Sequence, residues 1–221
     1  MIVAIHQPNF LPWWGYFYKV SQCDIFVFLD DVPFSKGSYF NRVKIRNTSN
    51  GDSVWLTVPV KTSGQLGQNI CDVKISSSDW QEKISNKLKS LYSKSLFFDT
   101  YREIICDQIK EFPSLLLSDL NKLLIKKIGQ LLGFCPKFVS SSDLSNNYGV
   151  ATERLISICK HFGAKTYVSG MGSKNYINEQ SFRDSDIDIK YVDFRKKDYH
   201  DISLSICDGL FMFGLDTYCT R

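Results

Sequence analysis

The chain has 221 residues, a length that fits one domain at roughly 100–200 residues per domain. Hydrophobic residues make up 43% and charged residues 23%, an ordinary globular composition that excludes global disorder and collagen-like repetition. The 27 basic residues only slightly exceed the 23 acidic ones and are dispersed along the chain, which argues against nucleic-acid binding.

Neither a leader nor a membrane segment is expected. The N-terminus opens directly into an apolar strand-like run, and the longest apolar stretches are far below the roughly 20 residues that a bilayer span needs. The seven cysteines are scattered, odd in number and without a CxxC pair, so we expect neither disulfides nor a metal site. The sequence therefore predicts a cytoplasmic protein that does not insert into membranes.

The predicted elements alternate between short buried strands and helices. Residues 1–5 and 25–29 are continuous apolar runs typical of buried strands, and residues 15–22 form a short helix between them. A further strand follows at residues 54–60, then helices at 79–92, 96–109, 114–132 and 151–162, and a strand at 165–169. We expect one three-layer α/β domain over residues 1–221, with a mainly parallel sheet and a helical insert at about 79–132.

The segment after the first strand carries the strongest functional signal. His6, Gln7 and Asn9 are interleaved with prolines, and Trp13 and Tyr16 offer apolar walls. Proline fixes such a loop, and a histidine exchanges protons near neutral pH, so we predict a catalytic role for His6. The alternative is that His6 only hydrogen-bonds a neighbouring strand.

A pair of carboxylates ends the second strand. Asp30 and Asp31 suit contacts to a cation, a hydroxyl or an amine, and we predict a catalytic role for Asp30 and ligand binding for Asp31. Either residue could instead cap the following turn. Further on, Tyr39, Asn41 and Arg42 are candidate ligand contacts, with Arg42 able to bind phosphate in a bidentate manner.

A turn rich in small residues follows the strand at 165–169. Ser169, Gly170 and Gly172 allow close backbone approach to a ligand, their N–H groups can cradle an anion, and Tyr176 follows them. The alternative is a tight turn without function. The carboxyl ends of parallel strands meet at one edge of a sheet. We therefore expect one pocket, walled by Trp13 and Tyr16, on which these residues converge: His6, Gln7, Asn9, Asp30, Asn41, Arg42 and the turn 169–172.

Taken together, these residues resemble the WbqC-like protein family of bacterial polysaccharide gene clusters. The resemblance runs over nearly the whole chain and is carried by residues 5–13, 15–17, 19, 24–32, 41–42, 55–60, 163–170, 176 and 204–208. The chain departs from the family pattern at residues 199–203, where the loop usual in the family is reduced. The resemblance implies N-acyl or aminoacyl decoration of a nucleotide-linked amino sugar.

A weaker resemblance concerns the fold. A strand, His6-x-x-Asn9, a helix and a second buried strand are similar to the layout of nucleotidylyltransferases, which implies a Rossmann-like fold. There, paired histidines stabilise the transferring phosphate, whereas here Asn9 stands in place of the second histidine.

Three functions from different classes follow from these patterns. The first is an N-acyltransferase with His6 as general base on the sugar amine, Arg42 on the diphosphate, and an activated acyl donor as co-substrate. The second is a nucleotidylyltransferase-like enzyme. The third is a non-catalytic binding subunit of a glycan-assembly pathway. No tightly bound cofactor is expected, and the partners are the sugar nucleotide and an acyl donor or acyl carrier, with a homodimer as a possible state.

Overall fold

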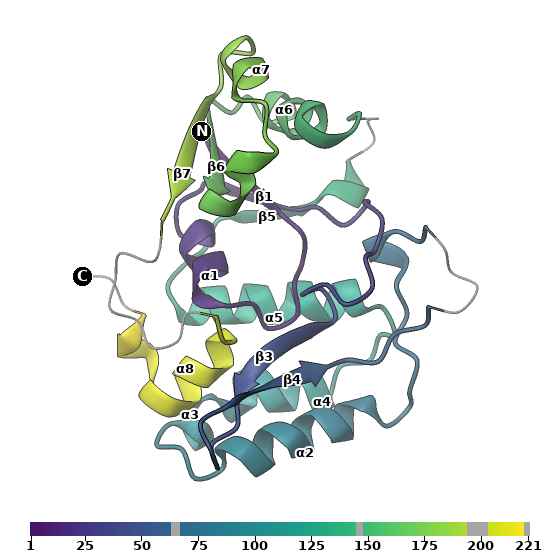
Figure 1. Ribbon diagram of the computed structural model, residues 1–221, viewed down its shortest axis with the longest axis vertical. Helices are drawn as coiled ribbons and strands as arrows, with labels where there is room; N and C mark the ends of the chain where they lie inside the picture. The colour runs from purple at the N-terminus through teal and green to yellow at the C-terminus, as the bar shows by residue number, and fades with distance from the viewer. Residues whose placement is uncertain (63–66, 145–147, 194–202, 219–221) are drawn as a thin grey trace.

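The computed structural model describes residues 1–62, 67–144, 148–193 and 203–218. Five strands form one parallel sheet in the order β5-β2-β1-β6-β7 (Figure 1). Their bounds are Ile2–His6 for β1, Ile25–Phe28 for β2, Lys137–Ser140 for β5, Thr166–Gly170 for β6 and Asp188–Val192 for β7. The expected α/β fold with a mainly parallel, Rossmann-like sheet is confirmed.

Helices cover both faces of this sheet. On one side lie α1 (Trp14–Val20) and α5 (Leu117–Leu131), and on the other lie α6 (Ala151–His161) and α7 (Glu179–Arg183) (Figure 1). Successive side chains of β1 alternate between the two cores, because a strand directs neighbours to opposite faces. Ala4 packs on the α1 and α5 side, whereas Val3 and Ile5 pack on the α6 and α7 side. This is why the strand is apolar throughout.

A second layer of structure extends from the α1 and α5 side. It contains an antiparallel pair, β3 (Arg42–Arg46) and β4 (Ser53–Thr57), and the helix α2 (Trp80–Tyr92). The helices α3 (Phe98–Arg102) and α4 (Gln108–Lys110) flank a π-helical turn at Glu103–Asp107. Helix α8 (Ile206–Phe213) packs nearby (Figure 1). Short 3-10 turns occur at Ile70–Asp72, Ser141–Asp143, Met171–Asn175 and Leu215–Thr217.

Several local details differ from the expectation. The strand predicted at 54–60 ends at Thr57, before Pro59. Asp79 occupies the N-cap position of α2, but its carboxylate accepts from Ser77 and pairs with Lys83 instead of capping the backbone. Strand β3 was not predicted, although its alternation of charged and apolar residues is the period-2 pattern of a half-buried strand.

The cysteines among the described residues are all free, and Cys219 lies outside those residues. Within the described ranges, no group of three or more His, Cys, Asp or Glu could hold a metal ion. No helix in those ranges has the length and apolarity needed to cross a bilayer. Residues 199–202 of the reduced loop also lie outside the described part of the chain.

Candidate functional site

A cavity of about 760 Å³ opens at the point in the sheet where the strand order reverses, between β1 and β6. From β1 the chain continues to β2 and β5 on one side, and it returns to β6 and β7 on the other. In open α/β sheets, ligands bind beyond the carboxyl ends of the strands at such a switch point. We call this cavity the switch-point pocket. It is lined by Ile5, His6, Gln7, Trp13, Gly15, Tyr16, Lys19, Leu29, Val32, Ala151, Thr152, Arg154, Leu155, Tyr167, Ser169, Gly170, Met171, Gly172, Ser173, Tyr176, Val192 and Asp193.

His6 is the last residue of β1 and lines the pocket as an uncharged imidazole. Burial lowers its pKa from 6.5 to about 3, and the charge of Lys19 adds to the effect, while a hydrogen bond with the Gln7 carbonyl opposes it. His6 Nδ1 lies 3.1 Å from Gln7 O, and a carbonyl oxygen can only accept. Nδ1 therefore carries the hydrogen and donates a hydrogen bond to Gln7 O, so Nε2 is the ring nitrogen that can accept a proton or a hydrogen bond.

Aromatic rings hold this imidazole in place. The ring centroid of Tyr16 lies 4.7 Å from that of His6, and the centroid of Trp13 lies 6.2 Å away, both in edge-on orientations. The Tyr16 hydroxyl donates to Gln7 O at 3.1 Å. The two predicted walls thus lie against His6 and restrict its orientation.

Lys19, on α1, places a buried amine in the same lining. Its Nζ donates to Ile5 O at 2.7 Å and lies 5.8 Å from the ring centroid of Tyr167. The pairing of β1 with β6 stops at Ala4 and Val168, although both strands continue further. Lys19 donates to the carbonyl of Ile5, the first residue of β1 beyond the paired stretch. Burial lowers the Lys19 pKa from 10.5 to about 8, so the amine is still mostly protonated at pH 7.

A second cation reaches the pocket from α6. Arg154 pairs with Asp31, and its Nη1 donates to Gly149 O at 3.4 Å. Asp31 also accepts from the Ser141 hydroxyl. Asp31 itself is not part of the lining, so in this structure it holds Arg154 at the pocket instead of facing a ligand.

The turn after β6 forms the opposite wall. Ser173 Oγ donates to Gly170 O at 2.8 Å and lies 2.6 Å from Ser169 Oγ. Because the single hydroxyl hydrogen of Ser173 goes to Gly170, Ser169 is the donor in the contact between the two serines. A Cβ built on Gly170 or Gly172 would meet no heavy atom within 4 Å. These glycines therefore leave open space, and the serine hydroxyls are engaged with the turn itself.

The structure brings together only part of the predicted set. His6, Gln7, Trp13, Tyr16, Ser169, Gly170, Gly172 and Tyr176 line the switch-point pocket, whereas Asn9, Asp30, Asp31, Tyr39, Asn41 and Arg42 do not. The expected convergence on one cavity was therefore wrong for Asn9, Asp30, Asn41 and Arg42.

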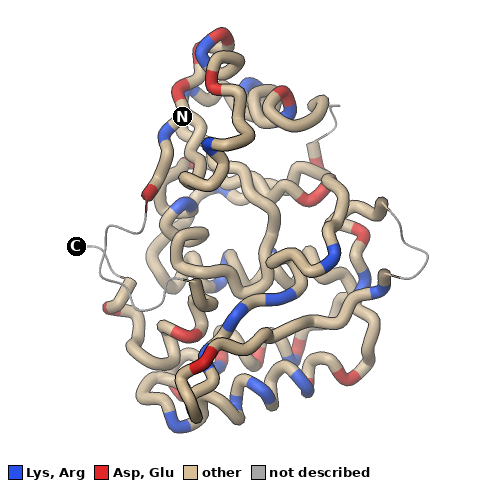
Figure 2. The backbone as a smooth tube through the Cα atoms, viewed as in Figure 1, with Lys and Arg blue, Asp and Glu red and all other residues tan. Residues whose placement is uncertain are grey.

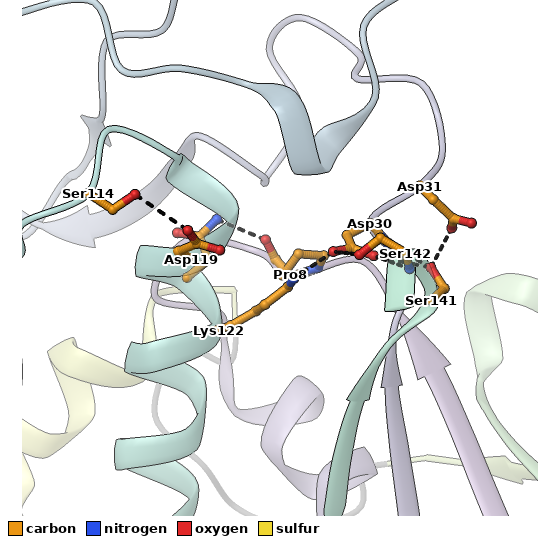
Figure 3. Close-up of polar contacts among 9 residues, drawn as sticks. Pro8, Asp30, Asp31, Ser114, Asp119, Lys122, Ser141 and Ser142 are labelled. Atoms are coloured by element: carbon orange, nitrogen blue, oxygen red, sulfur yellow. Dashed lines mark hydrogen bonds and ion pairs between the residues drawn. The ribbon is translucent and has the colours of Figure 1, made fainter. Parts of the chain in front are cut away.

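Asp30 differs most from its predicted place. Its carboxylate is fully buried and accepts from Lys122 Nζ at 2.5 Å, from Ser142 N at 3.0 Å and from Ser142 Oγ at 2.9 Å (Figure 3). Helix α5 and the turn after β5 supply these donors. Three donors, one of them a cation, engage the carboxylate, which is the arrangement of a structural ion pair.

The asparagines also serve the framework. Asn41 Nδ2 donates to Val58 O at 3.1 Å, and Asn9 is buried. Helix α5 fixes the loop that contains Asn9, because Asn121 Nδ2 donates to Pro8 O and Phe40 O, each at 2.8 Å. This anchoring turns the loop away from the pocket after Gln7.

Sequence reasoning missed Lys19, Thr152, Arg154 and Asp193 as pocket residues. A signal for Lys19 exists: it is a lysine three positions after Tyr16 on the apolar face of a short helix, where a charge is rarely buried without a role. Arg154 carries no local signal, because only the packing of α6 on the sheet brings it to the end of β1.

The comparisons with known proteins agree with the resemblance drawn from the motifs. The model of the WbqC-like protein family matches residues 7–218. The chain belongs to the WbqC-like protein family. It is also similar to the uncharacterized protein Rv1507c of Mycobacterium tuberculosis, with 32% identity over 231 aligned positions that cover 99% of each chain. No solved structure matches this WbqC-like chain significantly.

Proposed function

We propose that this WbqC-like protein is a transferase that acylates the amine of a nucleotide-linked amino sugar in surface-polysaccharide synthesis, with the amine in the switch-point pocket. One observation carries the proposal: a neutral imidazole, His6, lines the cavity together with a buried cation, Lys19. The cavity of about 760 Å³ is within the range of roughly 300–1,000 Å³ typical of ligand sites.

The chemistry needs an acceptor for one proton and a charge for one oxyanion. The amine nitrogen attacks the carbonyl carbon of an activated acyl donor, a C–N bond forms, and the bond from carbonyl to leaving group breaks. The nitrogen becomes strongly acidic as the leaving group departs and the amide forms, so at this stage His6 Nε2 can take its proton although the His6 pKa is about 3. The proton then passes to the leaving group.

Lys19 suits the second requirement. A protonated amine in a desolvated site stabilises a developing oxyanion more than it would in water. Only one of its three N–H donors is used by Ile5 O among the described contacts. Asp30, which the sequence suggested as a catalytic residue, has no part in this proposal because its carboxylate is engaged by protein donors.

The test is to incubate the purified protein with a panel of amino-sugar nucleotides and activated acyl donors and to detect the amide product by mass spectrometry. We expect a product whose mass exceeds that of the sugar nucleotide by one acyl group. His6→Gln should lower turnover by about 10²–10⁴-fold while sugar-nucleotide binding is retained. Lys160→Gln, an exposed lysine on α6, is the matched control with wild-type turnover.

Other outcomes would point to the other two functions. Release of pyrophosphate in the presence of magnesium, without amide formation, would indicate nucleotidylyl transfer. Binding of the sugar nucleotide without turnover, unchanged by His6→Gln, would indicate a non-catalytic binding subunit. The cytoplasmic location and the acyl donor or carrier as partner are parts of the same proposal.

A further inference from the structure

A row of aromatic rings leads from the switch-point pocket to the outer surface. Trp13 lines the pocket, the centroid of the Tyr39 ring lies 5.5 Å from that of Trp13, and the centroid of Trp55 lies 5.9 Å from that of Tyr39. Tyr39 and Trp55 are 43% and 36% exposed, which is unusual for large rings that contact each other. We call Tyr39 and Trp55, with the cations described next, the ring strip.

Two cations flank the outermost ring. Arg42 Cζ lies 4.2 Å from the centroid of the Trp55 ring, and Lys44 Nζ lies 5.6 Å from it. In the β3–β4 register, Lys44 is directly opposite Trp55, so both face the same side of the pair. The other side, with Val43 and Leu56, is buried in the core. The cations and the ring therefore lie together on the outer face of β3 and β4, where basic residues follow one another along β3 (Figure 2).

These two cations lack the anionic partner that their neighbour has. Arg46, the next residue on the same face of β3, pairs with Asp208 at 3.2 Å. Among the described residues, no carboxylate pairs with Arg42 or Lys44. The Arg42 Nε is buried without a hydrogen-bond partner, as are the Nε atoms of Arg46 and Arg154. A surface cation usually gains little from a partner, but a buried guanidinium nitrogen without an acceptor is costly.

We propose that the ring strip is a binding site for a nucleoside diphosphate. The flat base stacks on Tyr39 and Trp55, and the diphosphate contacts Arg42 and Lys44. Aromatic stacking is tolerant of base identity, and Arg and Lys are the usual phosphate partners. Tyr39, Arg42, Lys44 and Trp55 all lie outside the pocket lining, so nucleotide binding to the strip does not depend on the proposed function.

The test uses isothermal titration calorimetry with nucleoside diphosphates of each common base and with inorganic pyrophosphate. We expect the wild-type protein to bind at least one nucleoside diphosphate more tightly than pyrophosphate, because stacking adds to the phosphate contacts. Trp55→Ala should weaken this binding by about 5- to 100-fold, and Trp55→Phe should restore much of it. Arg42→Gln and Lys44→Gln should weaken it and reduce its dependence on salt.

The controls separate the ring strip from the pocket. Leu96→Ala removes an exposed apolar side chain that lies neither on the ring strip nor on the pocket lining, and it should leave nucleoside diphosphate binding unchanged. Wild-type affinity in both Trp55→Ala and Arg42→Gln, or loss of binding in Lys19→Gln alone, would place the nucleotide in the pocket and overturn the inference. Absence of binding by every nucleoside diphosphate would overturn it as well. Binding that depends on Trp55 without any acyl product would leave the ring strip in place and refute the transferase.

Discussion

Two polar groups follow neighbouring strands of the sheet, yet they differ in how their charges are compensated. After β2, the Asp30 carboxylate accepts from Lys122 and Ser142 within a closed network (Figure 3). After β1, Lys19 bonds only a backbone carbonyl among the described contacts, and His6 is held uncharged.

This difference shows that position at a strand end does not by itself make a functional residue. Both groups lie where parallel sheets bind ligands, but α5 and the turn after β5 supply Asp30 with donors and so close that end of β2. The end of β1 faces a cavity instead. A charge that the protein itself has satisfied has little left to offer a ligand, whereas an uncompensated one does.

The largest expected effect is on stability, and it comes from removing the Asp30 carboxylate from its closed network. Asp30→Ala leaves Lys122 without its partner in a site where the carboxylate was fully buried, so we expect the free energy of unfolding to fall by about 3–5 kcal/mol. Urea denaturation followed by circular dichroism measures this change. Asp119→Ala, on the exposed side of the same helix, should cost less than about 1 kcal/mol. A similar loss in both variants would contradict the structural assignment of Asp30.

A double replacement sharpens that result. Asp30→Leu combined with Lys122→Met removes both charges at once, and it should recover much of the stability that Asp30→Ala loses. If the double variant is no more stable than the single one, the pair is not the source of the loss.

The next largest effect is the loss of stability at acidic pH that follows from the lowered pKa of His6. The His6 pKa is about 3 in the fold and 6.5 ordinarily, so between these values the unfolded chain binds more protons than the folded one. Stability should therefore fall as the pH drops from about 6.5 towards 3, by about 1–2 kcal/mol between pH 7 and pH 5. Urea denaturation at both pH values measures the loss. His6→Gln should reduce it by that amount, and an equal loss in the variant would show that His6 is not desolvated.

Stability at alkaline pH tests whether the Lys19 amine is desolvated. The Lys19 pKa is lowered from 10.5 to about 8, so above pH 8 the folded protein releases a proton that the unfolded chain keeps. Stability should rise by about 1 kcal/mol between pH 7 and pH 9 relative to Lys19→Met. Guanidinium denaturation of both proteins at these pH values gives the difference. Parallel curves would mean that Lys19 is hydrated in solution.

The smallest expected effect on stability belongs to the glycine turn. Gly170→Ala and Gly172→Ala place a methyl group in open space, so the free energy of unfolding should change by about 0.5 kcal/mol or less. The midpoint of thermal unfolding should therefore change little. Both methyl groups fall on the pocket lining, so ligand binding should weaken more than stability does. A large drop in the unfolding midpoint would show that the turn is tightly packed.

The sequence by itself determined the framework. The continuous apolar runs at β1 and β2 predicted a buried parallel sheet, because strands covered on both faces need apolar side chains in both directions. The Pro-rich loop after the first of these strands pointed to His6, Gln7, Trp13 and Tyr16, all of which line the pocket. Local pattern is informative here because the residues lie within one short segment.

Only the tertiary structure decided which charges are free. The sequence could not show that Lys122, some 90 positions after Asp30, neutralises that carboxylate, or that Arg154 enters the pocket with Asp31 holding it. Nor could it show that Arg42 lies on the ring strip outside the cavity. The desolvation and pairing of a charged group depend on residues that packing brings from distant segments, and no local spacing encodes those neighbours.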